Sequence, residues 1–170
     1  MGPARLVLMR HAKSAYPEGI PDHDRPLSPR GKRDAQAAAQ WFAEHGAVHL
    51  GPDPVVLVSS AVRTRMTWEI VRSAFGQARA QDTPAVYEAV VSTLVNLCAG
   101  PIGEGRSTLV IGHNPGIEQL ADFLADASAS APEWSQREKY PTSGIAVLDF
   151  KDDSWAQDSA LVQAFVLPRG

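Results

Sequence analysis

Residues 5–14 read Arg5-Leu6-Val7-Leu8-Met9-Arg10-His11-Ala12-Lys13-Ser14, an apolar run that gives way abruptly to charged and polar side chains. The apolar part shows no alternation with polar residues. This pattern is typical of a strand that is buried on both faces of a parallel sheet. We therefore expect residues 5–9 to form a first strand, with Arg10 and His11 directly beyond its carboxyl end.

Similar short apolar runs recur along the chain and alternate with segments of helical period. Runs at residues 54–58, 85–87 and 107–111 predict three further strands. Two later runs, residues 144–148 and 161–166, are separated by a polar stretch and predict a hairpin at one edge of the sheet.

Helix signals lie between these strands. The first helix is expected to run from a cap at Ser28-Pro29 to a C-cap at Gly46. Ser60 and Asn114 are expected to cap two further helices, and another helix is expected within residues 88–99. The alternation of strand and helix predicts an α/β fold, a Rossmann-like three-layer α/β/α sandwich. Its central sheet is expected to be mostly parallel, with about six strands and one antiparallel edge.

Composition limits the classes of protein to consider. A chain of 170 residues suits a single domain spanning residues 1–170. Sixteen basic and nineteen acidic side chains give a net charge of −3, which excludes a broad basic surface for nucleic acid but not a small basic pocket. The longest apolar runs fall far short of the roughly 18 residues that span a membrane, and the N-terminus has no signal-peptide pattern. We expect a cytoplasmic protein with neither a membrane nor a nucleic-acid partner.

Chemically active side chains follow each of the first four predicted strands. Arg10 and His11 follow the first, Arg63 the second, Glu88 the third and His113 the fourth. Ligands of open α/β sheets bind beyond the carboxyl ends of the strands, so these groups are expected at one edge. Guanidinium forks match phosphoryl oxygens, and a neutral imidazole is a nucleophile at phosphorus. The set therefore predicts phosphoryl transfer.

Residues 8–14 resemble the Arg-His signature of the histidine phosphatase superfamily, the phosphoglycerate-mutase-like group. Further blocks resemble its short bacterial branch, the SixA-type phosphohistidine phosphatases. These blocks are residues 24–31, 59–69, 87–89 and 110–116. Because the blocks occur in the family's order, the resemblance is specific, and it extends from about residue 5 to about residue 150.

The resemblance implies a role for several residues. His11 would be the nucleophile that becomes phosphorylated, and Arg10 and Arg63 would clamp the phosphoryl oxygens. His113 would donate a further hydrogen bond to the transferring group. Ser14, or its backbone, would also contact the phosphate.

Glu88 has two possible roles, one catalytic and one structural. In larger relatives an acidic residue near this point donates a proton to the leaving group. The short branch often lacks a dedicated acid, and the labile P–N bond of phosphohistidine needs less help from one. The alternative is a carboxylate at the start of a helix, where the helix dipole favours it.

Other polar residues near these blocks are expected to have structural roles. Arg65 is expected to be solvated or ion-paired, in contrast to Arg63. Asp24-Arg25 is expected to fix the loop that enters the first helix. Cys98 is expected to be buried and inert, since it lies beside Leu97 in a helical stretch.

These observations predict a metal-independent phosphatase, without a cofactor, that acts on phosphohistidine of a protein through a phosphohistidine intermediate. A small phosphorylated metabolite is the alternative substrate. The absence of the long insertions that cover the site in mutases favours an open site. A phosphate-recognising binding module with little turnover is the alternative function. A metallohydrolase that uses His11, Asp22, His23 and His113 is a third hypothesis, although His23 has no second cluster of ligands at metal-binding spacing.

Overall fold

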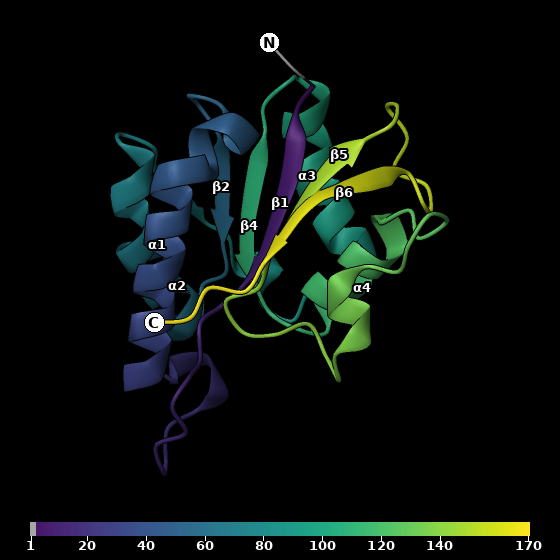
Figure 1. Ribbon diagram of the computed structural model, residues 1–170. Helices are drawn as coiled ribbons and strands as arrows, with labels where there is room; N and C mark the ends of the chain where they lie inside the picture. Colours follow the sequence, from purple (N-terminus) through teal and green to yellow (C-terminus); the bar gives the residue numbers. More distant parts are fainter. Residues whose placement is uncertain (1–2) are drawn as a thin grey trace.

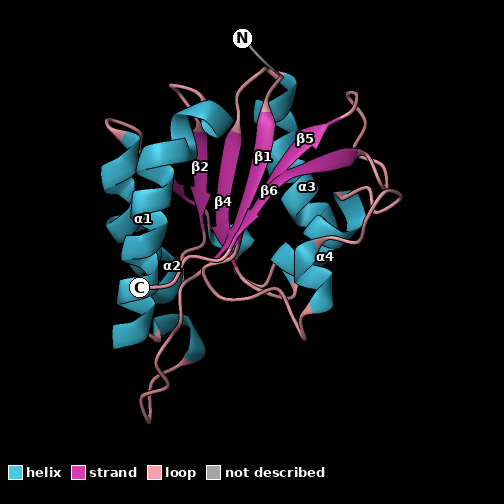
Figure 2. Ribbon diagram, viewed as in Figure 1, coloured by secondary structure: helices cyan, strands magenta, loops and turns pink. Residues whose placement is uncertain are grey.

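A six-stranded sheet with helices on both faces forms the centre of the computed structural model, which describes residues 3–170 (Figures 1 and 2). The strand order is β3-β2-β4-β1-β5-β6. The strands are β1 (Arg5–Arg10), β2 (Val55–Val58), β3 (Ala80–Asp82), β4 (Thr108–Gly112), β5 (Ile145–Phe150) and β6 (Ala160–Val166). The α-helices are α1 (Pro29–Leu50), α2 (Val62–Val71), α3 (Val91–Gly103) and α4 (Gly116–Leu124). Short 3₁₀ helices are η1 (Asp22–Asp24), η2 (Arg72–Phe75), η3 (Pro84–Val86) and η4 (Glu133–Gln136).

The first four strands are parallel, and their carboxyl ends meet at one edge. β1 pairs with β4 so that Leu8 lies opposite Val110, and β4 pairs with β2 so that Ile111 lies opposite Val58. β5 runs antiparallel to β1, and β6 runs antiparallel to β5. The expected α/β sandwich, with a mostly parallel sheet and a hairpin at one edge, is confirmed.

The two faces of the sheet carry separate hydrophobic cores, and β1 contributes to both. Leu6 and Leu8 point into the core under α3 and α4, whereas Val7 and Met9 point into the core under α1 and α2. Successive side chains of a strand point to opposite faces, so a strand covered on both sides is apolar at every position. This explains the unbroken apolar run at residues 6–9.

The first helix begins as expected but ends later. The Ser28 hydroxyl accepts the backbone N–H of Gly31 at 3.0 Å, which confirms the predicted N-cap. The predicted C-cap at Gly46 is wrong, because Gly46 is buried within α1 and the helix continues to Leu50. Gly51, with a φ of +68°, ends it. The helix extends because Leu50 adds one more buried side chain to the core.

The expected third strand is wrong. Residues 84–86 form η3, and β3 lies earlier in the chain. Pro84 cannot donate to a sheet ladder, which disfavours a strand there. Val86 is buried in the core beneath α3 and α4, so the apolar run reflects packing rather than strand pairing.

Two predicted helix caps are also wrong. The N-cap of α2 is Ala61, which follows Ser60, and the N-cap of α4 is Pro115, which follows Asn114. Neither helix has a side-chain capping hydrogen bond. The Ser60 hydroxyl instead lies 2.9 Å from Nε2 of His23. The Asn114 amide donates to the Tyr140 carbonyl oxygen at 2.9 Å. Both side chains therefore contact loops whose positions the sequence pattern does not predict.

Cys98 is buried in α3, as expected, and burial raises the pKa of its thiol to about 12. Within residues 3–170, no helix is both long and apolar enough to cross a membrane.

Candidate active site

A cavity of about 740 Å³ lies at the carboxyl edge of the parallel strands. Four side chains that the sequence places at strand or helix ends line it together. They are Arg10 at the end of β1, His11 directly after it, Arg63 in the first turn of α2 and His113 directly after β4. The rings of His11 and His113 lie 5.2 Å apart between centroids. The structure therefore brings together the four groups from distant parts of the chain.

His11 is held with one ring nitrogen facing the cavity. Its Nδ1 lies 2.7 Å from the carbonyl oxygen of Ala12, and a carbonyl only accepts, so Nδ1 carries the proton. Nε2 therefore keeps its lone pair, and Nε of Arg63 lies 3.4 Å from it. Burial, and next the nearby His113, Arg10 and Arg63, hold the pKa of His11 well below its usual value. The ring is thus neutral at neutral pH, with a lone pair on Nε2.

Arg10 is fixed by the backbone of a distant loop. Its Nη1 donates to the carbonyl oxygen of Tyr140 at 2.8 Å, and the Tyr140 hydroxyl donates to the Leu8 carbonyl oxygen at 2.7 Å. Burial lowers the pKa of Arg10, and the positive charge of Arg63 contributes to the same shift. Two guanidinium groups close to each other form a site that favours an anion between them.

Arg63 is buried and is anchored by Asp22. Nη1 of Arg63 donates to the Asp22 backbone oxygen at 2.8 Å, and Nη2 donates to Oδ2 of Asp22 at 3.2 Å. Arginine has five N–H donors, of which these two and the one toward His11 are used, so two remain for a ligand. Arg65, two residues later, is exposed and outside the cavity, as expected.

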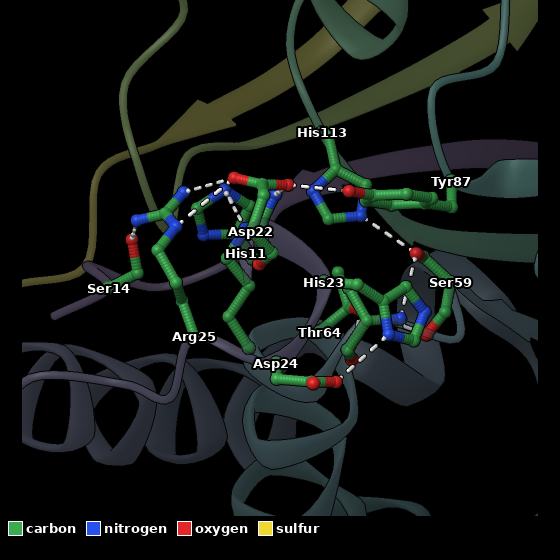
Figure 3. Close-up of polar contacts among 12 residues, drawn as sticks. His11, Ser14, Asp22, His23, Asp24, Arg25, Ser59, Thr64, Tyr87 and His113 are labelled. Atoms are coloured by element: carbon green, nitrogen blue, oxygen red, sulfur yellow. Dashed lines mark hydrogen bonds and ion pairs between the residues drawn. The ribbon is translucent and has the colours of Figure 1, made fainter. Parts of the chain in front are cut away.

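Asp22, Tyr87 and Arg25 also belong to this cavity, although sequence reasoning gave none of them a place in a phosphate site. The Tyr87 hydroxyl donates to Oδ2 of Asp22 at 2.6 Å, and the Arg25 guanidinium donates to Oδ1 at 3.0 Å (Figure 3). These hydrogen bonds, first from Tyr87 and then from Arg25 and Arg63, hold the pKa of Asp22 far below its usual value. Asp22 is therefore a fixed anion, unsuited to donate a proton.

Ser14 lines the cavity but has a partner already. Its hydroxyl accepts from Nη1 of Arg25 at 2.7 Å. The loop that carries it packs against the start of α1, where Ser28 N–H donates to the Lys13 carbonyl oxygen at 2.9 Å. A Cβ at Gly31 would lie 1.9 Å from that same oxygen, so only glycine permits this approach. This explains why a glycine occurs at position 31 of the motif.

Glu88 lines the cavity from a strained turn before α3. Its φ is +56°, in the left-handed region, and its side chain is exposed. Within the described part of the chain, its carboxylate forms no ion pair or hydrogen bond. The interpretation of Glu88 as a carboxylate at the start of a helix is wrong, because α3 begins only at Val91.

His113 is held by a buried serine. Its Nε2 lies 2.7 Å from Oγ of Ser59, at the end of β2 (Figure 3). Burial, and next the charge of Arg63, lower the pKa of His113 to about 3. The ring is neutral at physiological pH, so only one of its two nitrogens donates a hydrogen bond.

The lowered pKa of His113 makes stability depend on pH. Between pH 6.5 and about 3 the unfolded chain binds a proton at this histidine and the folded chain does not, so stability is lost as the pH falls through this range. We expect this histidine to cost about 2 kcal/mol of the free energy of unfolding between pH 7 and pH 5. Urea denaturation of the wild type and of His113→Gln at both pH values measures the effect.

A matched control is His45→Gln, because His45 lies exposed on α1 away from the cavity. This variant should lose as much stability between pH 7 and pH 5 as the wild type does. His113→Gln should lose less. Equal losses in all three proteins would contradict the assignment of a buried, neutral His113.

The metallohydrolase hypothesis requires a cluster of metal ligands. Across residues 3–170, no group of three or more His, Cys, Asp or Glu side chains has a geometry that could hold a metal ion. His23, which the hypothesis needs, contacts Ser60 and Asp24.

Known proteins share both sequence and fold with this chain. Residues 6–97 match the family model described as histidine phosphatase superfamily (branch 1). An uncharacterized protein of Mycobacterium tuberculosis, Rv1276c, is 42% identical over 143 residues, which cover 82% of this chain and 85% of the relative. A candidate phosphohistidine phosphatase SixA from Agrobacterium tumefaciens has a similar structure, with a TM-score of 0.80, 28% identity and coverage of 99% of this chain and 100% of that chain.

A second candidate SixA, from Nakamurella multipartitia, gives a TM-score of 0.76 at 31% identity over 99% of this chain and 98% of that chain. The resemblance seen in the motifs is therefore confirmed. Because the matched residues make up more than half of its length, the chain belongs to the histidine phosphatase superfamily, branch 1.

Proposed function

We propose that residues 1–170 form a single-domain, metal-independent phosphatase that works through a phosphohistidine at His11 and removes phosphate from phosphohistidine of a protein. One observation carries this proposal. Nε2 of His11 keeps its lone pair, approached only at 3.4 Å by Nε of Arg63, beside a cavity that Arg10, Arg63 and His113 also line. A nucleophile, two guanidinium groups and a further donor are the parts that phosphoryl transfer requires.

In the first step, the Nε2 lone pair of His11 attacks phosphorus in line with the leaving group. A new N–P bond forms, and the bond to the leaving group breaks with its electron pair on the leaving nitrogen or oxygen. Arg10 and Arg63 bind the phosphoryl oxygens and offset the negative charge of the transition state. His113 donates a further hydrogen bond, and Ser14, or its backbone, contacts the phosphate from the wall of the cavity.

In the second step, water attacks the phosphorus of phosphorylated His11 within the same clamp. The N–P bond breaks, the lone pair returns to Nε2, and inorganic phosphate leaves with the protons of the attacking water. The proton on Nδ1, held by the Ala12 carbonyl, keeps the ring in the productive tautomer throughout.

Phosphohistidine is the proposed substrate because the site has no firmly held proton donor for a leaving group. Asp22 is locked as an anion, and the Glu88 carboxylate has no partner among the residues described. An imidazole leaving group needs less assistance than an alkoxide. The similarity to structures named as phosphohistidine phosphatase SixA supports the same substrate class.

A small phosphate ester is the second candidate substrate, since Glu88 does line the cavity and an acid there would serve an alkoxide leaving group. The test compares phosphohistidine peptides, phosphoserine peptides and small phosphate esters on wild type and Glu88→Gln. An acid role of Glu88 would make Glu88→Gln lower ester hydrolysis about tenfold or more relative to phosphohistidine hydrolysis. Equal losses on all substrates would remove the acid role of Glu88.

The same panel tests the class of activity. Wild-type rates should be unaffected by a chelator such as EDTA, and a rate that is lost with EDTA and restored by a metal ion would contradict metal independence. A protein that binds phosphorylated peptides but hydrolyses none of the panel would be a binding module.

A further inference from the structure

The cavity holds an unusual share of the chain's positive charge. Eight of the sixteen Lys and Arg side chains line it, against three of the nineteen Asp and Glu side chains. The chain as a whole has a net charge of −3, so the cations are concentrated here. A cavity lined by one sign of charge raises the local concentration of the opposite sign.

Five of these eight cations already have partners or roles. Arg10 and Arg63 form the phosphoryl clamp, and Arg25 binds Asp22 and Ser14. Arg30 and Arg169 both lie within ion-pair distance of Asp34, at 3.3 and 3.6 Å.

The remaining three cations are Lys13, Arg137 and Lys139. Within residues 3–170, none of them lies within 4.0 Å of a carboxylate oxygen. Lys13 comes from the loop after β1, two residues beyond His11, and the other two come from the segment after η4. The pKa of Arg169 is lowered chiefly by burial, and the charges of Arg30 and Arg137 lower it further, which indicates excess positive charge on this side of the cavity.

The cavity is also too large for a phosphoryl group alone. A volume of about 740 Å³ lies within the range of about 300–1,000 Å³ for pockets that take a drug-sized ligand. Such a volume leaves room for further groups next to the phosphoryl group, and the unpaired cations favour negative ones.

We propose that Lys13, Arg137 and Lys139 form an outer anion subsite that binds acidic side chains flanking the phosphorylated histidine of the protein substrate. This rests on the proposed function. Arg137 and Lys139 are exposed and Lys13 is half-buried. Long side chains from two separate segments suit carboxylates whose spacing varies, because the two lysines act as mobile point charges beside the guanidinium of Arg137. Complementary charge of this kind mainly sets specificity and association rate.

The experiment uses two phosphohistidine peptides of equal length, one with Asp and Glu beside the phosphohistidine and one with Asn and Gln. kcat/KM is measured at low salt for wild type, for the Lys13→Gln, Arg137→Gln, Lys139→Gln triple variant, and for a control triple variant. The control is Lys32→Gln, Arg65→Gln, Arg79→Gln, which makes the same charge change at exposed positions outside the cavity.

We expect the wild type and the control to prefer the acidic peptide about tenfold, equal to about 1.4 kcal/mol. The subsite variant should lose most of that preference, as should the wild type at 0.5 M salt. Hydrolysis of both peptides without a preference, or a preference that the subsite variant retains, would overturn the subsite alone. The bisphosphate and the monophosphate of one sugar are assayed beside the peptides. A preference that appears only between these two sugars would assign the cations to small polyanions and overturn the proposal. No hydrolysis of either peptide would overturn both the proposed function and the subsite.

A second, independent inference concerns the contact between Ser59 and His113. Oγ of Ser59 is buried, accepts the backbone N–H of Ala61 at 3.3 Å and lies 2.7 Å from Nε2 of His113. Among residues 3–170 it has no other partner. The Ser59 hydroxyl proton therefore has one acceptor in reach, Nε2 of His113.

This contact determines the tautomer of the neutral ring. If Nε2 accepts from Ser59, the ring proton lies on Nδ1. That nitrogen is buried, has no partner in the described chain and lies on the side of the ring toward Asp22 and His11 (Figure 3). We infer that Ser59 is a positioning residue that makes His113 a donor toward the phosphoryl group through Nδ1–H.

Nitrogen-15 NMR of the histidine rings tests this directly. The wild type should show His113 protonated on Nδ1, and Ser59→Ala should shift the ring toward the Nε2–H form and lower kcat about tenfold. Ser59→Thr, which keeps the hydroxyl, should retain the wild-type tautomer. A wild-type His113 that is protonated on Nε2 would overturn the inference whether or not the variants fold, and so would an unchanged tautomer in folded Ser59→Ala.

Discussion

Replacement of His11 by alanine is expected to lower the turnover of phosphohistidine peptides and of a generic aryl phosphate at least about 10⁴-fold. The physical reason is that, in the proposed mechanism, Nε2 of His11 supplies the lone pair that attacks phosphorus. In the structure this lone pair is preserved by the proton on Nδ1 and by the low pKa of the ring. Steady-state release of inorganic phosphate measures the loss.

A labelling experiment separates loss of the nucleophile from loss of the fold. Rapid quenching of the wild type with a phosphorus-32 substrate should trap an acid-labile phosphoprotein, and His11→Ala should give none. His45→Ala serves as the matched control, since His45 is an exposed histidine on α1. Wild-type turnover by His11→Ala would end the proposed mechanism, and a wild type that binds substrate without covalent label would favour a binding module.

The strands and the four groups at their ends were predictable because their pattern depends on burial alone. A strand covered on both faces is apolar at each position, as β1 shows at Leu6, Val7, Leu8 and Met9. The carboxyl ends of parallel strands lie at one edge of the sheet. His11 and His113 follow two such strands, so they lie at this edge regardless of how the loops fold. The rule needs only strand identity and order. The shift of the third strand to β3 did not affect it, because neither His11 nor His113 follows that strand.

The anchors of the site were not predictable in this way, because they lie on loops. Asp22 lies in η1, and Tyr87 directly follows η3. Their contact, 65 residues apart along the chain, depends on how two loops fold over the cavity. Asp22 and Arg25 are three residues apart, a spacing that predicts a local ion pair between them. It does not predict that Asp22 also pairs with Arg63. The predicted helix caps at Ser60 and Asn114 were wrong for a similar reason. These side chains contact residues of distant loops instead of capping the helices that follow them.

Arg63→Lys is expected to lower kcat about 10²–10³-fold, a loss of roughly 2.7–4 kcal/mol in transition-state stabilisation. Lysine keeps the positive charge but has no planar fork, so it cannot donate to His11, to Asp22 and to a phosphoryl group at once. The loss should appear mainly in kcat, because the phosphoryl oxygens carry their altered charge in the transition state.

Arg65→Lys is the matched control, because it makes the same change on the same helix, two residues away, at an exposed position outside the cavity. It should keep wild-type kcat and KM. Because Arg63 also anchors Asp22, thermal denaturation of both variants shows whether part of the Arg63→Lys loss comes from the loop that carries η1. A folded Arg63→Lys protein with the kcat of Arg65→Lys would mean that charge alone suffices at this position, and that the fork geometry of Arg63 does not stabilise the transferring phosphoryl group.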